Sequence, residues 1–95
     1  MNESFDLVWK RIYDNAGSDF LTIQGKPFQY EIEGNYFIPL KPVSNRPKIP
    51  KEKVKEAYEM WPVTGPRVYS QAGFMGPSYI WGLFNDSRII NKENN

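Results

Sequence analysis

The sequence predicts a single α+β domain in which an N-terminal helix and a second helix cover one face of a small antiparallel sheet, with a short third helix near the C-terminus. Apolar residues recur with the 3.6-residue period of a helix in two segments, and with the two-residue period of a strand between them. The length of 95 residues fits one domain. We place this domain at residues 1–90 and expect residues 91–95 to be a polar tail.

Both long helices are predicted from a single apolar stripe. Ser4 or Asn2 can cap the first helix, and Gly17 is placed to end it. Its stripe has six members, namely Phe5, Val8, Trp9, Ile12, Tyr13 and Ala16. Pro50 fits the first turn of the second helix and Pro62 stops it. The stripe of that helix is Val54, Ala57, Tyr58 and Trp61.

The sheet is predicted from alternation around a tight turn. Phe28, Tyr30 and Ile32 alternate with polar residues, which is typical of a half-buried strand. Gly34–Asn35 is a two-residue turn, and 36–38 returns as the partner strand until Pro39. The result is a hairpin, or a three-stranded meander if residues 20–23 add a strand. The four prolines between 39 and 50 predict an extended loop.

The C-terminal third is punctuated by glycine and proline. Between residues 63 and 76 we expect loops and one short strand at Arg67–Tyr69. Residues 76–85 can be read as a helix or a strand, and the placement of Pro77 near the start favours a short helix. Arg88–Ile90 is predicted to add a closing strand.

The composition excludes several kinds of chemistry. The chain has no cysteine and no histidine, so it has neither a disulfide nor the residues of serine–histidine or cysteine–histidine catalysis. Glu31 and Glu33 form a carboxylate pair, but strand alternation assigns them to the solvated face. We therefore expect no catalytic residues, no metal site and no cofactor.

The cellular location is predicted from two features that the sequence lacks, a membrane-spanning segment and a signal peptide. The longest apolar run, residues 79–84, is far shorter than the roughly 20 residues that cross a bilayer. The first residues do not form a basic segment followed by an apolar one, as a signal peptide would. We expect a cytoplasmic protein without a membrane partner.

Positive charge is concentrated in fifteen residues of a chain whose formal net charge is only +1. Residues 41–55 contain six lysines and arginines but one glutamate. Clustered cations attract nucleic-acid phosphates, whereas lysines on an exposed helix face also occur for solubility alone. The predicted nucleic-acid-binding residues are Lys41, Arg46, Lys48, Lys51, Lys53 and Lys55.

Two smaller candidate sites lie near the C-terminus. Ser78 at the start of the third helix and Arg88 beyond its end could hold an anion, although Asp86 and Arg88 could instead form a local salt bridge. Trp81 and Phe84 could form an exposed aromatic patch for a protein partner or a second copy of the chain, although such rings more often fill a core.

Four segments carry a resemblance to a known group of domains. They are Phe28–Ile32, Ala57–Pro62, Gly76–Leu83 and Asp86–Ile89. In these segments the chain resembles small bacterial domains associated with restriction-type nucleases and mobile elements. The resemblance implies an accessory module that binds DNA or a protein partner and has no catalytic residues of its own. Our expectation is a non-catalytic domain that binds nucleic acid, with protein–protein interaction or homodimerisation as the alternative.

Overall fold

The computed structural model describes residues 3–40 and 47–91, and within them the fold is the predicted α+β type. Lys41, Arg46 and residues 92–95 of the predicted tail lie outside the described residues. The described part contains four helices and four strands. In chain order these are α1 (Phe5–Asp14), β1 (Phe20–Leu21), β2 (Pro27–Glu33), β3 (Tyr36–Leu40), β4 (Ile49–Pro50), α2 (Lys51–Met60), α3 (Pro66–Gln71) and α4 (Pro77–Phe84).

Helix α1 forms where the apolar stripe predicts it. The Ser4 hydroxyl accepts a hydrogen bond from the Leu7 amide at 3.4 Å, which caps the first turn. Val8 and Ile12 are buried. The buried stripe is narrower than predicted, because Tyr13 is 63% exposed.

The sheet is antiparallel, with the strands in sequence order from β1 to β4. The hairpin of β2 and β3 has the predicted turn, and Ile32 lies opposite Phe37. Two expectations were wrong. Pro39 lies inside β3, and a short strand, β4, forms within the predicted loop. Pro39 is tolerated within β3 because β4 pairs only with Tyr36 and Phe37. The edge of β3 at Pro39 therefore has no β4 partner that would need an amide hydrogen.

The C-terminal half is more helical than predicted. Residues 67–69 belong to helix α3 instead of a strand, and Pro66 occupies the first helical position, where its fixed φ suits a helix. Arg88–Ile90 forms no strand. The amides of Ile89 and Ile90 both donate to the Asp86 carbonyl, so this segment is a turn whose two isoleucines are buried.

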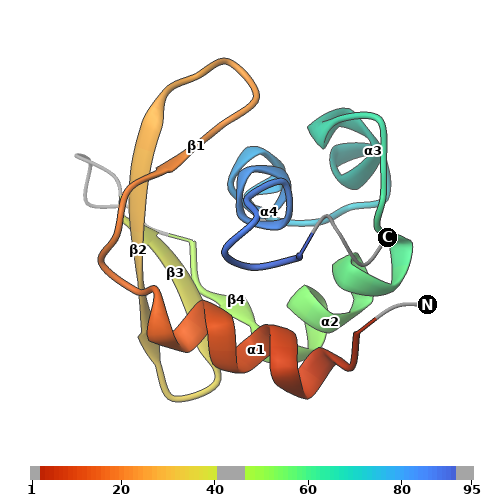
Figure 1. Cartoon of the computed structure of the whole chain (residues 1–95). Helices are drawn as coiled ribbons and strands as arrows, with labels where there is room; N and C mark the ends of the chain where they lie inside the picture. Colours follow the sequence, from red (N-terminus) through yellow and green to blue (C-terminus); the bar gives the residue numbers. More distant parts are fainter. Residues whose placement is uncertain (1–2, 41–46, 92–95) are drawn as a thin grey trace.

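Helix α4 occupies the centre of the fold. In Figure 1 it lies between the sheet on one side and α3 on the other, while α1 and α2 close the bottom of the molecule. Its buried residues Ile80, Leu83 and Phe84 join one cluster with the rings of Phe20, Tyr30 and Phe37 on the inner face of the sheet. None of the described helices has the length and apolar character needed to cross a membrane.

Candidate functional site

The described part of the predicted basic segment does not form one cationic surface. Lys48 is exposed beside the sheet, where its Nζ lies 3.9 Å from a carboxylate oxygen of Glu33. Lys51 lies at the start of α2, with its Nζ 5.4 Å from the centre of the Trp9 ring on α1. The two ammonium groups thus face different elements of the fold.

The lysines of α2 also separate from one another. Residues two apart on a helix point about 200° apart, so Lys51 and Lys53 lie on opposite flanks of α2. The Nζ of Lys53 lies 6.0 Å from the centre of the Phe74 ring and 3.4 Å from the Oε1 of Glu56, on the flank of α2 opposite to Lys51. Lys55 is exposed and lies one turn beyond Lys51.

Between these two flanks, the most solvent-facing side of α2 is acidic. Its buried side is Val54, Ala57 and Tyr58. Three exposed glutamates at the spacing i, i+4 and i+7 occupy the opposite side, namely Glu52, Glu56 and Glu59. A phosphate backbone approaching α2 would meet these carboxylates between the lysines, which weakens the attraction that the sequence predicts.

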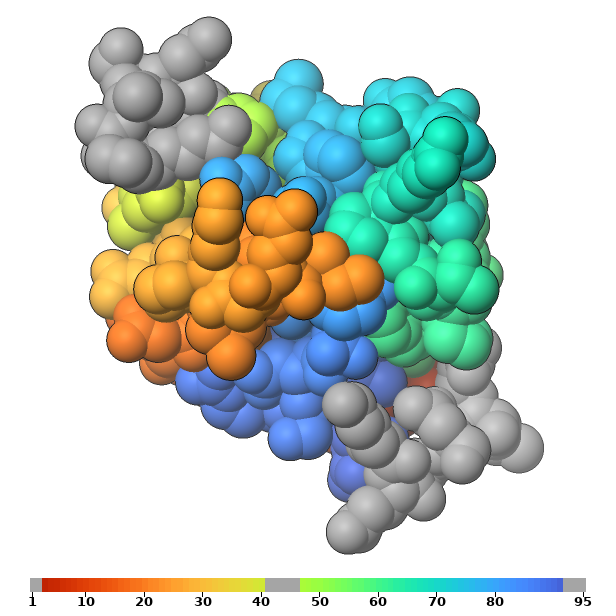
Figure 2. Space-filling model, turned by 90° about the horizontal axis from the view of Figure 1, so that it is seen from above, coloured from red at the N-terminus to blue at the C-terminus, as the bar shows by residue number. Residues whose placement is uncertain are grey.

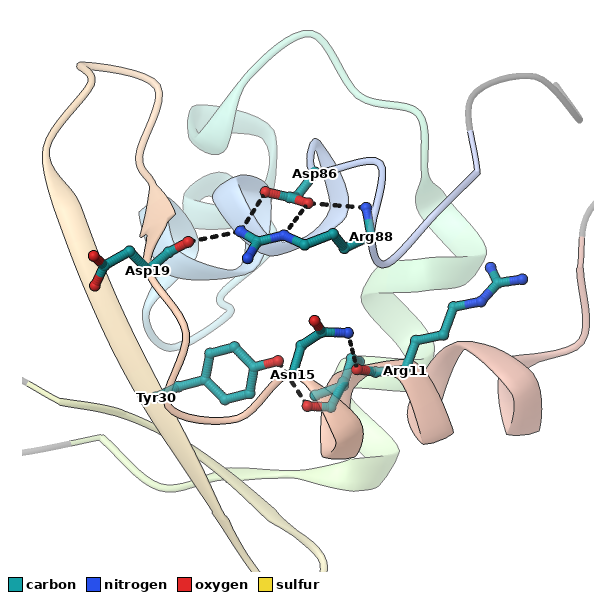
Figure 3. Close-up of polar contacts among 7 residues, drawn as sticks. Arg11, Asn15, Asp19, Tyr30, Asp86 and Arg88 are labelled. Carbon is teal, nitrogen blue, oxygen red and sulfur yellow. Dashed lines mark hydrogen bonds and ion pairs between the residues drawn. The ribbon is translucent and has the colours of Figure 1, made fainter.

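Ser78 and Arg88 do not form a joint anion site, because they lie at opposite ends of α4 and line different depressions of the surface. Arg88 makes the local salt bridge with both carboxylate oxygens of Asp86, at 2.9 Å each. It also donates to the main-chain oxygen of Asp19 at 2.6 Å (Figure 3). Its guanidinium carbon lies 4.1 Å from the centre of the Phe20 ring. The hydrogen bonds to Asp86 raise the pKa of Arg88 above its ordinary value.

The predicted exposed patch of Trp81 and Phe84 is absent from the described surface. Phe84 is only 1% exposed, because its ring packs against the rings of Tyr58 and Trp61 at 5.9 and 5.8 Å. Trp81 is half-buried, with its ring centre 6.3 Å from that of Trp61. The prediction of an exposed patch was wrong because α4 packs against α3, β1 and α2. The periodicity of apolar residues within one helix does not indicate how many other elements cover it.

A groove that sequence reasoning missed lies between the β1–β2 loop and the first turn of α4. Its volume is about 420 Å³. Figure 2 looks down on the loop, which lies beside the first residues of α4. The loop contributes Thr22, Ile23, Gln24 and Lys26, and the other wall is formed by Gly76, Pro77, Ser78 and Tyr79.

The loop wall of the groove is held by its own hydrogen bonds. The amide of Thr22 donates to the Lys26 carbonyl at 3.0 Å, and the Lys26 amide donates to the Thr22 hydroxyl at 3.2 Å. Between them Gly25 has a φ of 79°, a left-handed conformation that suits glycine. These contacts hold the two ends of the loop together.

The helix wall of the groove is fixed by close packing. Gly76 has a φ of 62°, and a Cβ at this position would lie 3.0 Å from the Cδ1 of Ile49. The ring of Tyr79 stands edge-on to that of Phe28 at 5.1 Å. Pro77 follows Gly76 directly and favours the start of helix α4 at this residue.

The groove is lined by polar and apolar residues in about equal measure. Ile23 is 49% exposed, and Met75, directly before Gly76 in sequence, is 57% exposed. Leu21 is also 57% exposed, but it lines the depression beside Asp86 and Arg88 instead. Lys26 is the one charged side chain among the described residues that line the groove. Within the described part of the chain, no carboxylate lies in ion-pair distance of Lys26, and no cluster of acidic residues could hold a metal ion.

Comparison with protein-family models, with curated proteins and with solved structures finds no significant match. The resemblance to small bacterial domains stays a prediction.

Proposed function

We propose that the chain is a non-catalytic binding domain that docks a partner protein at the groove between the β1–β2 loop and the start of α4. The single observation that carries the proposal is the coincidence of this groove with exposed apolar side chains. Ile23 lines the groove and is 49% exposed, and Met75, which directly precedes the lining residue Gly76 in sequence, is 57% exposed. Exposed apolar side chains grouped around a depression are typical of interaction sites.

The contacts within the two walls support the same role. Binding is less costly in conformational entropy when the receiving surface is already ordered. The loop wall is closed by two hydrogen bonds between Thr22 and Lys26, and the helix wall is set by the contacts of Gly76 and Tyr79. A partner segment would thus meet a preformed surface.

Nucleic-acid binding is the second candidate, favoured by one observation. Lys48, Lys51, Lys53 and Lys55 lie within eight residues of one another, and all keep part of their side chains in water. The acidic side of α2 and the opposite orientations of Lys51 and Lys53 argue for the protein partner as the better proposal.

Selection of ligands from a random twelve-residue peptide display library, with the full chain as bait, tests the proposal. We expect peptides whose binding weakens at least tenfold, or about 1.4 kcal/mol, with Ile23→Ser. Tyr13→Ser is the matched control, because Tyr13 is 63% exposed on α1 and lies away from the groove residues in sequence. Peptides that bind equally well to both variants would refute the groove as the docking site. Circular dichroism checks that both variants fold.

A further inference from the structure

We infer that the partner segment held by the groove carries an acidic side chain next to an apolar one. The inference rests on the proposed function and adds the chemistry of the partner. Its basis is the charge of the lining. Lys26 is exposed, and among the described residues that line the groove it has the only charged group.

The charge of Lys26 is uncompensated in the described part of the chain. Three other described lysines form ion pairs, Lys10 with Asp14 at 2.7 Å, Lys48 with Glu33 at 3.9 Å, and Lys53 with Glu56 at 3.4 Å. Lys51 and Lys55 form none with described residues, but both lie on α2 and outside the groove. No such ion pair between described residues includes Lys26. A carboxylate of a partner would therefore meet an ammonium group that gives up no ion pair with another described residue on binding.

The neutral groups around Lys26 suit a carboxylate. Ser78 on the opposite wall carries a hydroxyl that can donate, and Gln24 on the loop carries an amide that can also donate. The described lining holds no carboxylate that would repel an acidic side chain. A basic segment, in contrast, would face Lys26 without any compensating charge in the lining.

The walls of the groove also carry apolar side chains that can contact an aliphatic side chain of the partner. Ile23 lies on the loop side, while Pro77 and the Tyr79 ring lie on the helix side. An aliphatic side chain between them would remove apolar surface from water on both walls. A nucleic-acid strand fits this lining less well, because phosphate binding relies on several cations along a groove and this groove offers one among its described residues.

Peptides from the display selection test the inference through their charge. We expect the enriched sequences to contain aspartate or glutamate beside a leucine, isoleucine or valine. The best peptide is then synthesised in two forms, one natural and one with every aspartate and glutamate replaced by asparagine and glutamine. Fluorescence anisotropy should give about tenfold weaker binding for the amide form, and a similar loss for the natural form with Lys26→Met. Lys10→Met is the matched control, since Lys10 is also exposed but lies on α1.

The outcomes separate the two proposals. If the amide form binds as well as the natural form and still depends on Ile23, the acidic partner is refuted while the docking site stands. If no selected peptide depends on Ile23, both proposals fail. Displacement of the peptide by a twelve-nucleotide dT strand at lower concentration than by the unlabelled peptide itself would refute the acidic partner and favour a nucleic-acid ligand instead.

Discussion

Gly82 on α4 lies directly against the main-chain carbonyl of Leu21 on β1. A Cβ at position 82 would overlap that carbonyl oxygen and would lie 2.9 Å from a ring carbon of Phe28. The obstacle is main chain and a buried ring, neither of which can move aside as a flexible side chain could. The absence of a side chain at Gly82 therefore sets the distance between α4 and the sheet, and through it the width of the groove.

We expect Gly82→Ala to lower the free energy of unfolding by about 3 kcal/mol, the upper end of the usual effect of overpacking. Urea denaturation followed by tryptophan fluorescence measures the change. Gly65→Ala is the matched control, because its φ of 179° is ordinary extended backbone and the nearest atom to its Cβ, the Cδ1 of Ile23, lies 3.7 Å away. That variant should stay within about 0.5 kcal/mol of the natural chain. Equal stabilities for the two variants would contradict the role assigned to Gly82.

Much of this fold could be predicted from local patterns, and the failures share one physical cause. The stripe of α1 from Phe5 to Ile12 and the Gly34–Asn35 turn are set by residues close in sequence, so their positions were correct, whereas Tyr13 and Ala16 at the end of the predicted stripe are exposed. Arg67–Tyr69 contains residues that favour strands, yet the segment is helical because Tyr69 packs into the core and donates to the Ala57 carbonyl at 2.9 Å. Tertiary contacts overrode local preference there.

The candidate site depended even more on distant contacts. Gln24 and Gly25 follow the possible strand at residues 20–23, and Gly76–Pro77 precedes the predicted third helix, so each segment is a local feature of the sequence. Nothing in the pattern indicates that they face one another, because about fifty residues separate them along the chain. The basic segment shows the converse case, because its lysines are close together in sequence. A count of charges along the chain takes no account of the direction in which each lysine points from α2.

Tyr30 and Tyr69 should make the domain sensitive to alkaline pH. Burial raises the pKa of both phenols, whose hydroxyls donate to main-chain carbonyls, that of Tyr30 to Ile12 at 2.6 Å. A raised pKa in the folded state gives stability that is complete below the unfolded value of about 10 and is lost as the pH rises towards the folded value. We expect the free energy of unfolding to be steady near pH 8 and to fall above about pH 10.

The variant Tyr30→Phe/Tyr69→Phe tests this dependence. Its stability at pH 8 should fall by about 2 kcal/mol, because two buried carbonyls lose a hydrogen bond, and its decline above about pH 10 should be shallower, because the buried phenols are gone. Tyr36→Phe is the control, since Tyr36 is 45% exposed. Urea denaturation at several values of pH between about 8 and 11 gives the comparison. An unchanged slope in the double variant would contradict the assignment.

Arg88 should contribute more to stability than an ordinary surface cation. It holds the turn after α4 to the start of β1 through Asp86, the Asp19 carbonyl and the Phe20 ring. We expect Arg88→Ala to lower the free energy of unfolding by about 2 kcal/mol, because hydrogen bonds that involve a charged group are among the stronger ones. Lys10→Ala removes an exposed pair with Asp14 and should change it by less than about 0.5 kcal/mol. Thermal unfolding followed by circular dichroism compares the two, and equal losses would show that the Arg88 contacts add nothing beyond a surface salt bridge.

The acidic side of α2 should limit binding to nucleic acid. We expect the natural chain to bind a fluorescein-labelled twenty-nucleotide dT strand no more tightly than about 10 μM at about 150 mM salt, which lies within the range of non-specific binding. Replacing Glu52, Glu56 and Glu59 with glutamine leaves Lys51, Lys53 and Lys55 as the charged side chains of α2, so binding should tighten and its dependence on salt should steepen. Fluorescence anisotropy at about 50 and 200 mM salt measures both effects. Tight, salt-sensitive binding by the natural chain, lost when the three lysines are changed to alanine, would instead favour the nucleic-acid hypothesis over the protein partner.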